Sequence, residues 1–168
     1  MPRLRLIAVA ALLSLTACHS RAQPPEATAN TAADSQAGAA FLAKNAKAPG
    51  VITTASGLQY KIIRSGAPTG VHPAPGDQVK VDYTGSLLSG DVFDSTVKRG
   101  EPAVLPLDGL VQGWMEALPM MRPGDHWILY VPSDLGYGPE GRPPVIPPAS
   151  TLVFDMTLID VLKANGAG

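Results

Sequence analysis

The sequence is poor in cysteine, in charge and in aromatic residues, and these shortages exclude several classes of protein. Cys18 is the only cysteine in 168 residues, so no internal disulfide can form in any compartment. The formal net charge is −1 and no basic stripe stands out, which argues against nucleic acid as a partner. His19, His72 and His126 show no metal-ligand spacing, so no metal site is expected.

Long hydrophobic runs are also missing, apart from one near the start of the chain. The run Leu6–Leu15 follows two arginines and is too short to span a bilayer as a finished helix, which is typical of an export signal. It ends in Leu15-Thr-Ala-Cys18, which resembles the bacterial lipobox that is cut just before its cysteine. We therefore expect a lipoprotein signal peptide over residues 1–17 and a lipid on Cys18. An ordinary secretory signal and a transmembrane anchor are the alternatives.

Residues 18–50 are expected to form a flexible tether with a short helix. His19–Ala37 is rich in Ala, Thr, Ser, Gln and Pro and has no apolar period, so it cannot bury enough surface to offset its chain entropy. Ala39–Lys47 can form a short helix before a Pro-Gly pair stops it. We expect the protein in the periplasm, anchored by its lipid to a bacterial membrane. The outer membrane is favoured because no aspartate follows Cys18.

The most informative stretch runs from Val79 to Thr96. Apolar and polar residues alternate over Val79–Thr84, which predicts a half-buried strand. Gly85 and Gly90 then supply a bend and a tight turn, and the chain returns through Val92–Thr96. The pattern predicts an antiparallel hairpin with one apolar face. On this pattern alone, core packing and a turn cap account for Tyr83, Phe93 and Asp94.

The remainder of residues 51–163 predicts one domain of α+β class, an antiparallel sheet of about five strands wrapped around one short helix. Low aromatic content with 17 glycines and 17 prolines suits short strands joined by turn-rich loops. The helix is expected within Leu110–Met121, where apolar residues recur at spacings of four. The other expected elements are strands at Leu58–Arg64, His126–Val131 and Thr151–Val161, an edge segment at Val104–Leu107, a long loop at Pro132–Ser150 and a tail at 164–168.

Five motifs occur in this order: VDYTG at 81–85, FDS at 93–95, GW at 113–114, GYG at 136–138 and IPPASTLVFD at 146–155. Together they resemble the FKBP-type peptidyl-prolyl isomerases, the macrolide-binding immunophilins, over about Gly57–Leu162. Phe41–Asn45 and Thr54–Tyr60 are similar to the Mip-like bacterial branch. The resemblance implies a ligand cleft between the bent sheet and its helix. In Mip-like proteins a long helical arm dimerises, and because only its final turns are expected here, we predict a monomer.

The implied activity is faster rotation about X-Pro bonds in envelope or secreted proteins. Peptide rotation faces a barrier of about 18–20 kcal/mol, because resonance gives the C–N bond double-bond character. The twisted transition state loses this resonance and is less polar than the planar amide, so an apolar cleft that excludes water favours it. Each tenfold in rate needs about 1.4 kcal/mol, which desolvation and one or two hydrogen bonds can supply. No nucleophile, metal or cofactor is required.

The resemblance also implies the apolar lining of the cleft. Trp114 would form the floor under the proline ring, although its helical spacing alone is more typical of a core residue. Phe154 likewise lies at a period of two within a strand, which is typical of core packing. The walls would be completed by Tyr83, Phe93, Val111, Val145 and Ile146.

Polar groups of the cleft follow from the same resemblance. The backbone N–H of Val111 and the hydroxyl of Tyr137 would hold substrate carbonyls. Asp94 would face the twisting imide, oriented by Arg99 and Tyr83, in an electrostatic role because no proton need be transferred. Asp94, Tyr137 and Tyr83 are thus the expected catalytic residues. A loop-filling Tyr137 and a solvated Arg99 are the alternatives from the residues alone.

Two positions depart from the family pattern. Ala103 stands where many relatives have an aromatic wall residue, which opens the pocket and leaves the affinity for a macrolide ligand open. Arg142 stands where some have histidine, which predicts a changed preference for the residue before proline. Two other functions also remain open: a non-catalytic, chaperone-like module that binds X-Pro or unfolded segments, and a lipid-tethered carrier of a small apolar ligand.

Overall fold

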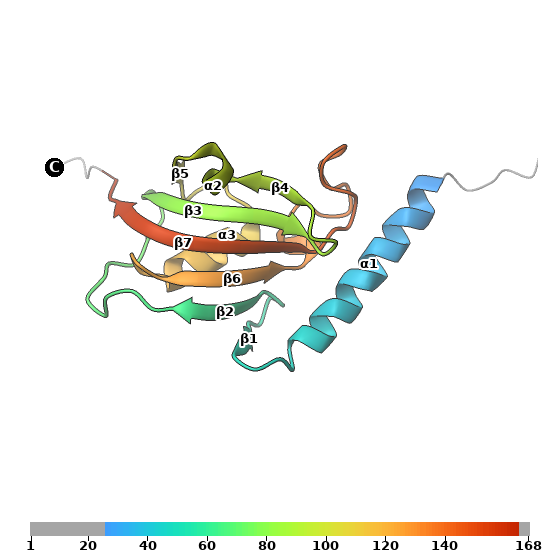
Figure 1. Cartoon of the computed structure of the whole chain (residues 1–168), viewed down its shortest axis with the longest axis horizontal. Helices are drawn as coiled ribbons and strands as arrows, with labels where there is room; N and C mark the ends of the chain where they lie inside the picture. Colours follow the sequence, from blue (N-terminus) through green and yellow to red (C-terminus); the bar gives the residue numbers. More distant parts are fainter. Residues whose placement is uncertain (1–25, 165–168) are drawn as a thin grey trace, which may run out of the picture.

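The computed structural model describes residues 26–164, and the side chains from residue 32 onward. The expected signal peptide and the expected lipidation site, Cys18, lie outside these residues. One sheet dominates the described chain, with one helix on its inner face and a long helix beside it (Figure 1). Within residues 26–164, no helix is both long enough and apolar enough to cross a membrane.

The sheet is antiparallel and seven-stranded, in the order β1-β2-β6-β7-β3-β4, with β5 also paired to β3. The predicted α+β class is confirmed, but the sheet has more strands than the five or so expected. β1 was missed because three residues are too few to carry a period of two. The strands are β1 (Val51–Thr53), β2 (Gln59–Arg64), β3 (Gln78–Leu87), β4 (Val92–Ser95), β5 (Ala103–Pro106), β6 (His126–Val131) and β7 (Leu152–Leu162).

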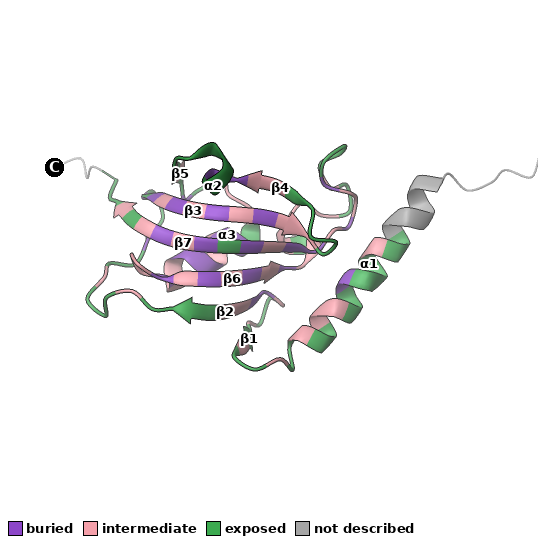
Figure 2. Cartoon of the chain, viewed as in Figure 1, coloured by how far each residue is buried: buried purple, intermediate pink, exposed green. Residues whose placement is uncertain are grey.

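The inner face of the sheet carries the core. Buried residues alternate with partly exposed ones along β3 and β6, as Figure 2 shows in purple and pink. Helix α3 (Gln112–Ala117) covers this face and continues as a 3-10 turn, η1 (Leu118–Met120). It is shorter than the predicted Leu110–Met121, because Val111 has extended backbone and Pro119 lies within the 3-10 turn. A second short helix, α2 (Thr96–Arg99), follows β4, and the 3-10 turn η2 (Ser133–Leu135) follows β6.

Helix α1 (Glu26–Asn45) corrects the expectation of a tether over this segment. It begins at Glu26 rather than at Ala39, because alanine is the best helix former and this segment is rich in it. Its weak apolar periodicity is what hid it from the sequence pattern. The prediction of a monomer rested on a short helix here, and the longer helix removes that argument.

The C-terminal half of α1 packs against the domain. Gln59 on β2 donates a hydrogen bond to the Leu42 carbonyl (2.9 Å) and accepts one from the Asn45 amide (2.9 Å). The rings of Phe41 and Tyr130 lie 5.8 Å apart. Because Tyr130 alternates with buried residues of β6, these contacts lie on the outer face of the sheet, opposite α3.

Candidate active site

A hollow of about 270 Å³ opens between α3 and the inner face of the sheet. It brings together Trp114, Tyr137 and Asp94, which come from α3, the long loop and β4. Their convergence is what the sequence-based hypothesis required. The hollow is lined by Tyr83, Phe93, Asp94, Leu105, Gly109, Leu110, Val111, Trp114, Tyr137, Arg142 and Phe154.

Four aromatic rings form the floor and walls of this hollow. Trp114 is only 4% exposed and meets Tyr83 edge-to-face, with ring centroids 4.8 Å apart and planes at 88°. It meets Phe154 in the same manner at 5.2 Å and 79°, and Phe154 in turn meets Phe93 at 5.7 Å and 88°. Edge-to-face contact is a preferred geometry for aromatic pairs. The rings therefore hold one another in place and present an apolar surface.

Gly85 and Gly113, the glycines of two sequence motifs, permit this aromatic packing. A Cβ at Gly85 would lie 2.7 Å from the Phe93 ring and 2.9 Å from the Phe154 ring. A Cβ at Gly113 would lie 2.8 Å from the Val131 side chain, so glycine lets α3 approach β6 closely. Both positions need glycine for space.

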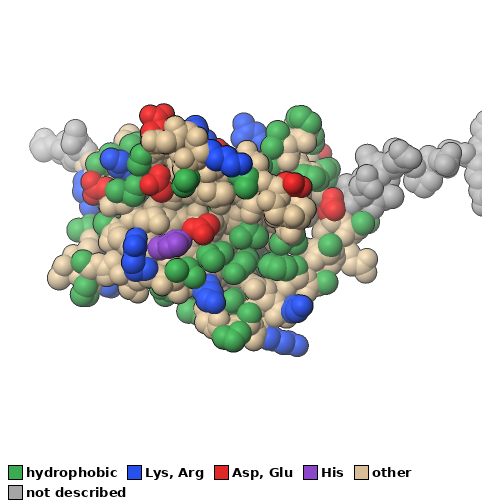
Figure 3. Space-filling model, in the orientation of Figure 1, with side chains coloured by type: hydrophobic (Ala, Val, Ile, Leu, Met, Phe, Trp, Pro, Cys, Tyr) green, Lys and Arg blue, Asp and Glu red, His purple; other side chains and the backbone are tan. Residues whose placement is uncertain are grey.

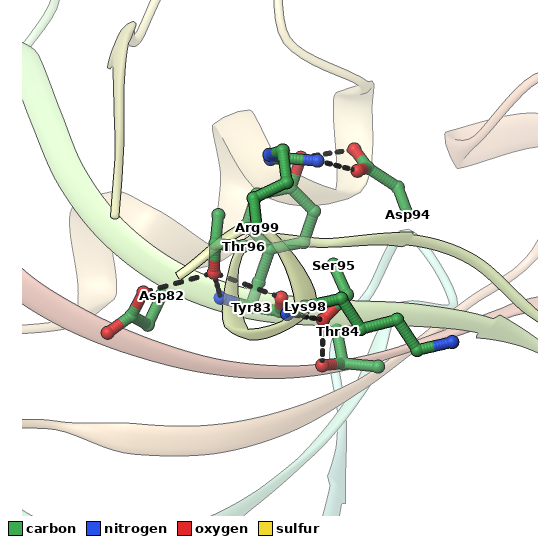
Figure 4. Close-up of polar contacts among 8 residues, drawn as sticks. All are labelled: Asp82, Tyr83, Thr84, Asp94, Ser95, Thr96, Lys98 and Arg99. Atoms are coloured by element: carbon green, nitrogen blue, oxygen red, sulfur yellow. Dashed lines mark hydrogen bonds and ion pairs between the residues drawn. The ribbon is translucent and has the colours of Figure 1, made fainter. Parts of the chain in front are cut away.

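Asp94 is held at the edge of the hollow by two donors. The Tyr83 hydroxyl and the Arg99 guanidinium each donate a hydrogen bond to its carboxylate, as Figure 4 shows. The guanidinium also lies 6.0 Å from the centre of the Tyr83 ring. These contacts give the carboxylate a defined orientation beside the aromatic walls.

The three groups shift one another's ionisation. Burial of Asp94 works to raise its pKa, but the hydrogen bonds from Tyr83 and Arg99 outweigh burial and hold this pKa below its ordinary value. Burial, then the bond to Asp94, raises the pKa of Tyr83. The bond to Asp94 raises the pKa of Arg99. Near neutral pH the site therefore contains a carboxylate, a neutral phenol and a guanidinium cation.

Thr96 fastens β3 to the start of α2 and was missed by sequence reasoning. Its fully buried hydroxyl accepts a hydrogen bond from the Tyr83 backbone N–H (2.8 Å) and can donate to the Asp82 carboxylate (3.0 Å), as Figure 4 shows. The preceding Ser95 accepts from the Lys98 N–H (3.3 Å) and caps α2. These bonds fix the backbone that carries both Tyr83 and Asp94. A Ser-Thr pair at the end of a strand was the available signal for the cap.

A second cavity of about 260 Å³ adjoins the first and shares Phe93, Asp94, Tyr137 and Arg142 with it. Its remaining lining comes from the Pro-rich loop and consists of Pro143, Val145 and Ile146. Ile146 is 3% exposed, whereas Val145 is 54% exposed, so Val145 borders the cavity from its open side.

Among the described residues, two hydrogen-bond donors on residues that line the first hollow have no internal acceptor. Val111 lines the hollow just before α3, and within the described residues its backbone N–H donates to no acceptor. The Tyr137 hydroxyl likewise has no hydrogen bond in this part of the chain, and Tyr137 lines both cavities. Both groups are therefore available to a ligand carbonyl.

Every predicted catalytic or substrate-binding residue except Arg99 borders one of the two cavities, and Arg99 acts on the site through Asp94. Sequence reasoning missed Leu105, Gly109, Leu110 and Pro143, which lie in or beside elements that it described only as packing or loop. Ala103 is absent from the lining of both cavities. Among the described residues, no group of three or more His, Cys, Asp or Glu side chains is arranged to hold a metal ion.

A protein-family model described as "FKBP-type peptidyl-prolyl cis-trans isomerase" matches residues 70–159. A second, the "domain amino terminal to FKBP-type peptidyl-prolyl isomerase", matches residues 9–62. With this sheet, hollow and family match, the chain belongs to the FKBP-type peptidyl-prolyl cis-trans isomerase family.

Individual relatives agree with this assignment. The chain is 49% identical over 124 residues to the "Peptidyl-prolyl cis-trans isomerase Mip" of Coxiella burnetii, covering 74% of this chain and 53% of the relative. It is 48% identical over 127 residues to the "Outer membrane protein MIP" of Legionella longbeachae, covering 76% and 54%. The crystal structure of FkpA from Escherichia coli matches with a TM-score of 0.78 at 40% identity, over 83% of this chain and 64% of that one. The chain thus spans about half the length of the curated relatives it matches.

Proposed function

We propose that this chain catalyses cis–trans isomerisation of X-Pro bonds in polypeptides, by binding proline in the aromatic hollow. The observation that carries the proposal is the convergence of Trp114, Tyr137 and Asp94 on one apolar cavity. Membership of the isomerase family supports it. The rival functions lack such support, because neither a holdase nor a carrier of a small ligand needs a carboxylate oriented beside an aromatic hollow.

Catalysis would arise from desolvation. Water stabilises the planar, polar amide more than the twisted one, so moving the amide into the hollow lowers the barrier to rotation. Trp114 would support the proline ring, while Tyr83, Phe93 and Phe154 exclude water from its sides. The Val111 N–H and the Tyr137 hydroxyl would each bind a substrate carbonyl and hold the chain on either side of the rotating bond. No cofactor takes part in this scheme.

Asp94 would act as a fixed charge beside the imide. Its pKa lies below the ordinary value, so it is ionised at neutral pH and cannot serve as a proton donor. Rotation about the C–N bond transfers no proton, and a carboxylate held by Tyr83 and Arg99 needs no reorganisation when the imide dipole turns. Val145 and Ile146 would contact the residue next to proline.

The proposed setting is the bacterial envelope. A relative is named an outer membrane protein, and the lipobox-like Leu15–Cys18 supports a lipid anchor on Cys18 in the periplasm. Mass spectrometry of the mature protein would find an acylated Cys18 at the amino terminus and, in Cys18→Ala, an uncleaved chain. An unmodified cysteine in the membrane fraction would contradict the anchor.

Exchange NMR on an Ala-Pro peptide tests the proposed activity. The chain should raise the cis–trans exchange rate at catalytic concentration, and Tyr137→Phe, which removes one hydroxyl, should lower kcat/KM while leaving the NMR spectrum of the folded domain intact. Peptide binding without acceleration would instead support a non-catalytic module. A co-purified apolar molecule together with indifference to proline peptides would support a carrier.

A further inference from the structure

Arg142 is a cation at the mouth of the site whose charge is not balanced. Its side chain lines both adjoining cavities and is exposed to solvent. Among the described residues, Arg99 forms a salt bridge with Asp94, whereas Arg142 forms none. Glu140, two positions earlier and also exposed, is not among its partners.

The backbone around Arg142 is fixed although its side chain is free. Its N–H donates to the Ile146 carbonyl (2.8 Å), and its own carbonyl accepts from the Ile146 N–H (3.0 Å). A Cβ at Gly141 would lie 2.4 Å from the Pro147 carbonyl oxygen, so the backbone segments that contain Gly141 and Pro147 lie close together. The guanidinium therefore projects from a braced loop rather than from a loose one.

The charges that border the two cavities do not cancel. Asp94 and Arg142 are the charged residues among their lining, and Asp94 already forms an ion pair with Arg99. An acidic group that enters the second cavity consequently meets one unbalanced positive charge. Guanidinium presents two parallel N–H donors that match a carboxylate, which makes an acidic side chain its best partner.

We propose that Arg142 gives this isomerase a preference for substrates with Asp or Glu directly before proline. The inference rests on the proposed function, because it requires proline to occupy the hollow above Trp114. The two cavities share Phe93 and Asp94, so a peptide with proline in the first must bring a neighbouring residue to the second. Asp94 would face the imide, which joins proline to the preceding residue, and the preceding side chain is thus the one beside Arg142.

The expected preference is modest because the ion pair is open to solvent. Exposed pairs of this kind favour binding by about two- to five-fold, and salt weakens them. The test compares kcat/KM for three peptides that differ only before proline, Glu-Pro, Gln-Pro and Lys-Pro, in low salt. The unaltered chain should turn over Glu-Pro about two- to five-fold faster than Gln-Pro, with Lys-Pro slowest. This ratio should fall towards one in molar salt.

Variants of the same chain make the test specific. Arg142→Gln should bring the Glu-Pro to Gln-Pro ratio to about one, and Arg142→Glu should make Lys-Pro the best of the three. Lys98→Gln is the matched control, because Lys98 is an exposed cation on α2 that lines neither cavity. It should keep the ratio of the unaltered chain. Because each ratio compares peptides turned over by the same variant, a change in the overall activity of that variant does not affect it.

Three results would overturn the inference. The first is an unchanged Glu-Pro to Gln-Pro ratio of kcat/KM in Arg142→Gln. The second is an equal loss of this ratio in Lys98→Gln, which would indicate that the overall charge of the protein, rather than Arg142, sets the preference. The third is a charge preference at the residue after proline rather than before it, measured on a matched Pro-Glu and Pro-Gln pair. Turnover of all peptides without charge preference overturns only this inference, whereas no turnover of any peptide refutes the proposed function itself.

Discussion

The two faces of the sheet hold their neighbours by different means. On the inner face, α3 and four aromatic rings pack edge-to-face, with glycine at the points of closest approach. On the outer face, α1 is held through the Leu42 carbonyl, the Gln59 amide and one aromatic contact. Figure 3 shows this outer face, with hydrophobic side chains near its centre and charged groups around them.

The inner face therefore shapes the proposed substrate hollow, whereas the outer face only holds α1 against the domain. Ring shape and position are critical on the inner face, because a moved ring changes the hollow in which proline would sit. A few hydrogen bonds and one ring contact hold α1 on the outer face, and none of the residues that line the two proposed substrate cavities belongs to α1. Activity should therefore be sensitive to changes on the inner face and tolerant of changes under α1.

Trp114→Ala should have the largest effect, because it removes the floor of the hollow. Truncation of a buried tryptophan costs about 3–5 kcal/mol of folding free energy. Isomerase activity on an Ala-Pro peptide should disappear, even in conditions where the variant remains folded. Denaturant unfolding and exchange NMR on the same sample measure the two effects together.

Trp127 provides the matched control within the same core. It is also 4% exposed, it stacks on Tyr60 with centroids 4.6 Å apart, and it lines neither cavity of the site. Trp127→Ala should lose similar stability while the folded fraction keeps its kcat/KM. Equal loss of activity per folded molecule in both variants would show that general core packing, rather than the hollow, sets the rate.

Gly85→Ala should have the second-largest effect, although it adds only a methyl group. The new Cβ would lie 2.7 Å from the Phe93 ring and 2.9 Å from the Phe154 ring, so these two rings, which both line the hollow, must shift. Overpacking of this kind costs about 1–3 kcal/mol. The kcat/KM for proline peptides should fall at least roughly tenfold, which corresponds to about 1.4 kcal/mol in the transition state. Ser86→Ala, at the next position of β3 with its side chain on the other face, should change neither quantity appreciably.

The inner face could be predicted well from sequence because its residues are chemically distinctive. Trp114, Tyr83 and Phe154 belong to residue types that are rare in this chain, and the order of their motifs and of the motif that contains Asp94 resembles one family. The strand periodicity was also strong where one face is buried, as in β3. Boundaries were less certain, because the start of α3 depends on the backbone of Val111 rather than on hydrophobic spacing.

The outer contact could not be predicted because it leaves only a weak apolar pattern. α1 touches the domain at Gly38, Phe41, Leu42 and Asn45, and a glycine and an asparagine on that face leave too few apolar side chains to mark a helical period. Thr96 escaped notice for a related reason. Its partners lie on a strand thirteen residues earlier, and a lone threonine after a strand does not reveal a buried hydroxyl that bridges two elements.

Asp94→Asn should lower activity by roughly tenfold, about 1.4 kcal/mol of transition-state stabilisation, while stability changes little. Asparagine keeps the size of the side chain and can still accept from Tyr83, but it loses the charge. The carboxylate and guanidinium side chains are 39% and 46% exposed, so water and salt screen their ion pair and it adds little to folding. Steady-state isomerisation and thermal unfolding of the variant separate these effects. Unchanged activity would remove Asp94 from the mechanism.

The pH dependence tests the same carboxylate without a mutation. The pKa of folded Asp94 lies below its ordinary value of 3.8, so its contribution to stability is fully present above that ordinary value, which the unfolded chain has. That contribution is lost as pH falls through the folded pKa. The raised pKa of Tyr83 keeps its phenol neutral up to and beyond pH 10. Activity should therefore be flat between about pH 5 and 9, and a midpoint near neutrality would contradict this assignment.

Gly38→Gln should have the smallest effect on activity and tests the outer face alone. A Cβ at Gly38 would lie 2.3 Å from the Thr151 hydroxyl oxygen, so the variant must separate α1 from the domain. The helix itself should persist, because glutamine is a better helix former than glycine by under about 1 kcal/mol. Loss of the contact between Phe41 and Tyr130 in NMR spectra, with kcat/KM unchanged, is the expected result. Ala39→Gln, one residue along and exposed, should keep that contact. A large loss of activity in the Gly38 variant alone would mean that α1 also supports the site, because Thr151 directly follows the loop that carries Arg142 and Ile146.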